Sequence, residues 1–131
     1  MKLKINYISL LIGLILGVAA WVIVPFVSDS FEPIDNDFAF YSGQSILSIA
    51  AFIFGFRFGM KPVFIFLLGV YISCNVYPFI YGSSESRAWA GLGLITNILF
   101  CIYPLVAGSL GKLIYLIWLK FTHNKAIKMD V

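Results

Sequence analysis

Charged residues are scarce in this sequence, and their scarcity argues against an ordinary soluble domain. Asp, Glu, Lys and Arg make up 11% of the 131 residues, while hydrophobic residues make up 61%. A soluble domain has about 25% charged and about 45–50% apolar residues. One small soluble core could not hide this much apolar side chain. The composition therefore predicts an all-α integral membrane protein.

The groups that most often carry chemistry are absent from the apolar runs. No Asp, Glu, Lys, Arg or His lies deep inside any run, which leaves no candidate proton relay or buried counter-ion. The sole histidine, His123, lies near the C-terminal end, and Cys74 and Cys101 belong to no Cys-x-x-Cys or zinc-ligand spacing. We therefore expect a protein that is not an enzyme and has no cofactor or metal. Because the basic residues are scattered between apolar runs, we expect no nucleic-acid partner.

Four apolar runs are long enough to cross a membrane as helices, which takes about 20 residues for a hydrocarbon core of about 30 Å. They cover residues 5–27, 38–56, 62–81 and about 89–110. We expect one transmembrane domain over residues 1–131, folded as a four-span antiparallel helix bundle. The short link at 57–61 should make the second and third spans antiparallel neighbours.

The basic residues indicate which way the chain crosses the membrane. With the N-terminus inside, Arg87 is the one base among nine that falls on an outer segment. Cytoplasmic loops carry the excess of Lys and Arg, so both termini should be cytoplasmic. We expect a multi-pass protein of the cell membrane, and a bacterial inner membrane is the location that we favour. The first run also resembles a cleavable signal peptide, with small residues at 18–20, but it continues to Val27, which favours an uncleaved span.

The apolar pattern continues after residue 110, and this makes the last run too long for one crossing. A helix over 89–119 would measure about 46 Å. We expect a break or bend near 108–111, followed by a short interfacial or cytoplasmic helical extension and a tail within 111–131. Pro104 could add a kink. The loop at 82–87 reads as an ordinary turn, and we find no internal repeat.

Polar side chains lie at one level in the outer half of the predicted bundle. Gln44, Asn75 and Asn97 are each about 9–12 Å from the outer end of their span. Thr96, Tyr77 and Ser45 lie close to that level. An amide facing lipid is costly, so these groups should face one another or water. They form a candidate polar cluster, which is either dry hydrogen-bonded glue between helices or an outward-facing pocket.

Small residues recur at four-residue spacing and predict smooth helix faces where backbones pack closely. The members are Gly13 and Gly17 in the first span, Ala51, Gly55 and Gly59 in the second, and Ala107 and Gly111 in the fourth. Such stripes serve packing within one chain or association between chains.

Two functions follow from these patterns. The first is a non-enzymatic structural or accessory membrane protein whose partners are the lipid bilayer and either a second copy or another membrane protein. The alternative is an oligomeric channel or carrier for a small polar solute that would use the polar cluster as its pocket.

Overall fold

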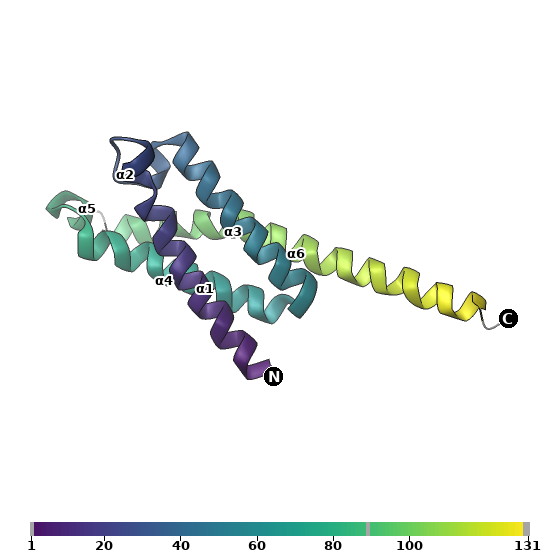
Figure 1. Ribbon diagram of the computed structural model, residues 1–131. Helices are drawn as coiled ribbons and strands as arrows, with labels where there is room; N and C mark the ends of the chain where they lie inside the picture. Colours follow the sequence, from purple (N-terminus) through teal and green to yellow (C-terminus); the bar gives the residue numbers. More distant parts are fainter. Residues whose placement is uncertain (1, 89, 130–131) are drawn as a thin grey trace.

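The computed structural model describes residues 2–88 and 90–129, and it is an all-helical four-helix bundle (Figure 1). The elements are α1 (Lys2–Val22), α2 (Val24–Val27), the 3-10 helix η1 (Pro33–Asp35), α3 (Asp37–Phe58), α4 (Met60–Tyr81), α5 (Ser84–Ala88) and α6 (Ala90–Met129). Four segments are long and apolar enough to span a membrane: Leu3–Val27, Asp37–Phe58, Met60–Tyr81 and Gly91–Thr122. The four apolar runs of the sequence are confirmed as helices. The loop at 82–87, predicted as a turn, instead contains the short helix α5.

The first span is interrupted near its end by a proline. Pro25 lacks an N–H group and cannot bond to the carbonyl of Trp21, so the regular helix stops at Val22 and resumes as α2. The loop that follows folds back over the end of the bundle. Within it Phe31 packs on the rings of Trp21 and Tyr77, with centroid distances of 5.7 and 6.3 Å. This loop therefore covers part of the end of the bundle with an apolar side chain, although it also carries acidic residues.

Local capping fixes both ends of α3. The side chain of Asn36 accepts a hydrogen bond from the N–H of Ala39 at 2.9 Å, which satisfies a free donor of the first turn. At the other end the chain reverses at Gly59, whose φ of +88° favours glycine, and whose N–H donates to the carbonyl of Phe54. Gly59 therefore makes the turn into α4 and is not part of a packing stripe, which corrects the sequence interpretation.

The largest helix contacts join α1 to α4 and α3 to α6, which are parallel pairs, while the sequential neighbours α3 and α4 have a smaller antiparallel interface. Helices α1 and α4 lie side by side (Figure 1), and glycines allow their close approach. A Cβ on Gly13 would overlap the carbonyl oxygen of Phe66, and a Cβ on Gly69 would lie 2.5 Å from the carbonyl oxygen of Leu10. Gly13 thus faces the residue three positions before Gly69, and Gly69 faces the residue three positions before Gly13.

The α3–α6 pair repeats this arrangement. A Cβ on Gly55 would overlap the carbonyl oxygen of Gly108, and a Cβ on Gly111 would overlap that of Phe52. Gly55 and Gly111 are 56 positions apart, as are Gly13 and Gly69. The hairpin of α1 and α3 therefore packs on the hairpin of α4 and α6 with the same offset of 56 positions at both contacts. This is a structural repeat that inspection of the sequence missed.

No break occurs in α6, and the prediction of one near 108–111 is wrong. The helix runs without interruption from Ala90 to Met129, through Pro104, and its 40 residues extend over about 60 Å. The glycines that suggested a break serve contact instead, because a Cβ on Gly108 would meet Val63 of α4 at 2.7 Å, and a Cβ on Gly111 would overlap the carbonyl oxygen of Phe52 of α3. Packing against α3 and α4 thus explains these residues, and the extension continues the helix axis (Figure 1).

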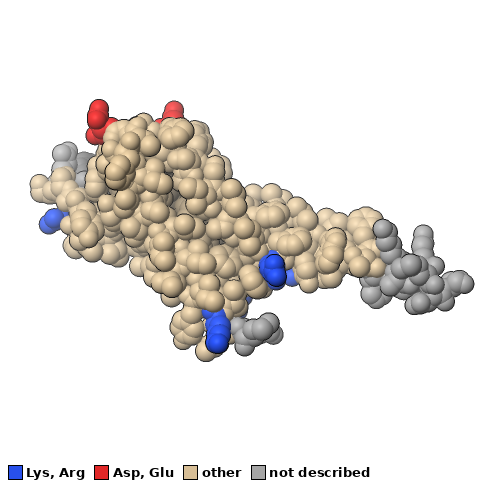
Figure 2. Space-filling model, viewed as in Figure 1, with Lys and Arg blue, Asp and Glu red and all other residues tan. Residues whose placement is uncertain are grey.

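Charge is divided between the two ends of the bundle. The loop end, formed by residues 23–37 and 82–88, carries the acids Asp29, Glu32, Asp35 and Asp37, and the turn end carries Lys4, Arg57, Lys61 and Lys112. Figure 2 shows red confined to the loop end, and blue at the turn end with a further patch beside α5. Apolar surface covers the wall between the two ends.

Candidate functional site

Two of the three amides predicted to cluster are hydrogen-bonded to each other across α4 and α6. The Nδ2 of Asn97 donates to the Oδ1 of Asn75 at 3.1 Å, and Asn97 is only 5% exposed. Asn75 in turn donates to the carbonyl of Tyr71, one turn earlier in α4. The Nδ2 groups of both residues and the Oδ1 of Asn75 therefore have hydrogen-bond partners within the protein.

The second bond of Asn97 compensates for a proline. Pro78 lies inside α4 and has no N–H to give to the carbonyl of Cys74, four residues before it. The Nδ2 of Asn97 donates to that carbonyl at 3.1 Å. An unpaired carbonyl at membrane depth is costly, and neighbouring side chains commonly satisfy the group that a proline frees. Asn97 therefore ties α6 to the one turn of α4 that lacks its own bond.

Gln44, the third predicted amide, is not hydrogen-bonded to this pair. The residue is 5% exposed, and neither its Nε2 nor its Oε1 has a hydrogen-bond partner. A buried polar group of this kind costs free energy unless it is bonded. The bundle interior thus holds one satisfied amide joint and one unsatisfied amide.

The remaining members of the predicted cluster do not join it. The hydroxyl of Thr96 bonds to carbonyls of its own helix and the residue is exposed, and Ser45 is arranged in the same way on α3. Tyr77 packs its ring on Trp21 at 6.2 Å instead of facing the amides. Sequence reasoning missed Tyr71, whose hydroxyl donates to the carbonyl of Leu94 at 3.0 Å. Its position one turn before Asn75 was the available signal.

The predicted small-residue stripes lie largely at helix contacts. Gly13, Gly17, Gly55 and Gly111 each face a neighbouring helix with no room for a Cβ, as described for three of them above. Ala51 of α3 is fully buried, and Ala107 of α6 is half-buried, one turn before Gly111. Within one chain, then, most of these residues already have their packing partners.

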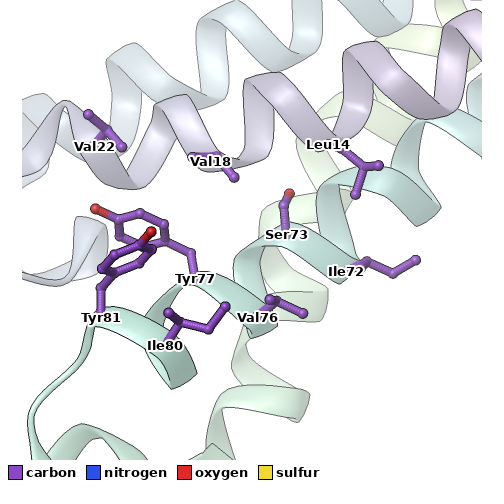
Figure 3. A pocket seen from close by; sticks show the side chains of 9 residues that line it. All are labelled: Leu14, Val18, Val22, Ile72, Ser73, Val76, Tyr77, Ile80 and Tyr81. Atoms are coloured by element: carbon purple, nitrogen blue, oxygen red, sulfur yellow. The ribbon is translucent and has the colours of Figure 1, made fainter.

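A groove of about 560 Å³ opens between α1 and α4 toward the loop end (Figure 3). Its walls are Leu14, Val18 and Val22 of α1 and Ile72, Ser73, Val76, Tyr77, Ile80 and Tyr81 of α4. The two helices touch at their glycines and diverge beyond them, which leaves a wedge-shaped space. The hydroxyl of Ser73 donates to carbonyls of its own helix, so the groove is apolar until the tyrosines at its outer end.

The C-terminal part of α6 extends away from the bundle. Tyr115 still touches Phe56 of α3, with ring centroids 5.7 Å apart, but residues 116–122 extend beyond the α3–α4 turn (Figure 1). We call residues 116–122 the projecting segment. Its apolar members, Leu116, Ile117, Trp118, Leu119 and Phe121, are each between 41% and 68% exposed. Lys120 and Thr122 are the polar residues of the segment, and its exposed apolar side chains cover most of its sides, a pattern that is normally buried.

The carboxyl of Glu32, at the loop end, has a raised pKa. Glu32 is half-buried under the folded loop, and this loss of hydration raises the pKa of its carboxyl above the ordinary 4.5. The neighbouring carboxylate of Asp35 raises that pKa further by repulsion. The folded loop therefore disfavours the charged form of Glu32.

Comparison of the chain with protein-family models, with curated proteins and with solved structures finds no match. Its function must therefore be argued from the geometry described above.

Proposed function

We propose that this protein is a four-span protein of the cell membrane, with both termini in the cytoplasm, that acts by binding a helix of another membrane protein or of a second copy of itself. In this proposal it is an accessory or structural protein and not an enzyme. The observation that carries the proposal is the projecting segment, whose five apolar side chains are between 41% and 68% exposed. Exposed apolar surface of this kind marks interaction sites.

The division of charge supports the membrane orientation. Lys4, Arg57, Lys61 and Lys112 lie at the turn end and the acids at the loop end. Placing the turn end in the cytoplasm obeys the rule that Lys and Arg stay inside. The broad apolar wall between the ends then faces lipid (Figure 2).

The bilayer alone is a poor cover for the projecting segment. The apolar stretch Gly91–Thr122 has 32 residues, or about 48 Å of helix. Even a tilt of about 40° uses only about 39 Å of helix to cross a core of about 30 Å. Because α6 is unbroken, the remaining turns cannot bend to lie along the membrane surface, and Lys120 is the one charged residue of the projecting segment, fewer than the polar face of an interfacial helix carries. A protein helix is the cover that remains.

Photo-crosslinking in intact cells tests this proposal. A benzoylphenylalanine placed at Leu116 should form a protein adduct, while the same residue at Ile95, which is 67% exposed near the start of α6, should not. An adduct of twice the chain mass of 14.6 kDa identifies a second copy, and any other mass identifies a different partner. Absence of a protein adduct at Leu116 and at Ile117, or equal adducts at Ile95, contradicts the proposal.

The alternative function, a channel or carrier for a small polar solute, has one observation in its favour. The unpartnered carboxamide of Gln44 is a group that a polar solute or water could satisfy. Against it, Asn75 and Asn97 already satisfy each other. The hollow of about 410 Å³ near Gln44 is lined by Asp37, Phe38, Tyr41, Ser42 and Ser45 of α3 alone, without any of the three amides.

A further inference from the structure

We propose that the groove between α1 and α4 is a binding site for one phospholipid of the outer leaflet, with an acyl chain in the groove and the phosphate at Arg87. This site is separate from the projecting segment, and it rests on the membrane location proposed above.

The depth of the groove matches one leaflet. It follows α4 from Ile72 to Tyr81, which is about 14 Å of helix, close to half of a hydrocarbon core of about 30 Å. Its deepest lining residues are Leu14 and Ile72, and there Gly13 and Gly17 of α1 pack directly on α4. A transmembrane helix would need a surface that continues through both leaflets, whereas an acyl chain needs only one.

The chemistry of the groove also suits an acyl chain. The walls contributed by Val18, Val76 and Ile80 are aliphatic (Figure 3). The hydroxyl of Ser73, in the deep part of the groove, already donates its hydrogen bond to the carbonyls of Gly69 and Val70, at 3.0 Å each. An occupant at this depth therefore gains nothing from polar groups, and burial of its apolar surface is the driving force.

The outer end of the groove suits a headgroup. Tyr77 and Tyr81 stand at that end with ring centroids 5.0 Å apart, in the position where tyrosines favour the membrane interface. Beyond them α5 follows directly after α4 and carries Arg87, an exposed base at an end that otherwise carries acids. A guanidinium pairs well with a phosphate, and the bidentate geometry available to Arg favours it over a simple point charge. Arg87 thus supplies the charge that is complementary to a phosphodiester.

Native mass spectrometry of the full chain, extracted from membranes in mild detergent, tests the site. Val76→Trp fills the groove, and Val106→Trp is the matched control, because both valines are about half exposed, at 47% and 54%, and Val106 lies on α6 outside the groove. Wild type and Val106→Trp should retain one phospholipid through delipidation. Val76→Trp should retain it at least about tenfold less, and Arg87→Gln should weaken retention several-fold and remove its dependence on salt.

The outcomes that overturn the proposal are distinct. Equal retention by Val76→Trp and wild type shows that the groove holds no lipid, and equal loss in Val106→Trp shows unselective retention. A dimer mass in place of a lipid adduct shows that a second copy occupies the groove. If Val76→Trp does not show the helical circular dichroism of wild type, Val18→Phe on the α1 wall of the groove repeats the test. Recovery of wild-type protein outside the membrane fraction would contradict the membrane assignment itself, which separates that failure from failure of the lipid site.

Discussion

The bond between Asn97 and the carbonyl of Cys74 can be isolated by changing the proline that makes it necessary. Asn97→Leu keeps the side-chain size but removes the donor to Cys74 and to Asn75. Measured side-chain hydrogen bonds inside membranes average about 0.6 kcal/mol and reach about 1.7. Loss of both bonds should therefore lower the free energy of unfolding by about 1–2 kcal/mol.

Pro78→Ala should relieve part of that loss. The new N–H at position 78 can bond to the carbonyl of Cys74 within the helix, since the two residues are four apart. In the Pro78→Ala background, Asn97→Leu then removes only the bond to Asn75. Its cost should fall by about 0.5–1 kcal/mol, which is the coupling energy between positions 78 and 97.

Reversible unfolding in mixed micelles with rising dodecyl sulfate, followed by circular dichroism, measures all four proteins of this cycle. Thr96→Ala is the control, because its hydroxyl bonds only to carbonyls of its own helix and should show no coupling to Pro78→Ala. Equal costs of Asn97→Leu in the two backgrounds would refute the argument that Asn97 replaces the bond lost to Pro78.

Three further predictions use the same unfolding assay. Gly55→Ala should lower stability, because its Cβ overlaps the carbonyl of Gly108, whereas Gly91→Ala, with open space around it, should raise stability by up to about 1 kcal/mol; equal effects would contradict the close packing. Gln44→Leu should raise stability by about 1 kcal/mol, because it removes a buried amide without partners, and a loss of stability would mean that the amide binds something in the membrane. Because the folded-state pKa of Glu32 is raised, stability should decrease as pH rises from 4.5 through that pKa, and Glu32→Gln should reduce this dependence; an unchanged pH profile would contradict the raised pKa.

The sequence was sufficient for the helices because their signal is local. Apolar length and the flanking charges identify the four helices, and each boundary lies near a turn residue such as Gly59 or a cap such as Asn36. The predicted break in α6 failed for a physical reason. Gly108 and Gly111 have low helix propensity, but close contacts with α4 and α3 explain them, and those contacts depend on distant segments.

The polar joint was only partly predictable for the same reason. The spacing of Pro78 and Cys74 reveals from sequence alone that a carbonyl is left without its helical partner. Which side chain satisfies it depends on the register of α4 against α6, and that register places Asn97 there and leaves Gln44 apart. The repeat at 56 positions was hidden because the glycine pairs match while most residues around them differ.

We propose that Asn75 and Asn97 form a dry joint, that Gln44 is also shielded from water, and that the protein acts through its helix surfaces. Labelling of single cysteines at Gln44 and Asn75, in intact cells and with Cys74 and Cys101 replaced, tests it most directly, with a cysteine at Asp35 in the loop as the positive control. We expect a charged, impermeant thiol reagent to modify position 35 and to leave positions 44 and 75 unmodified. Modification at both 44 and 75 would reveal a water-filled cavity and would contradict this account in favour of a channel or carrier.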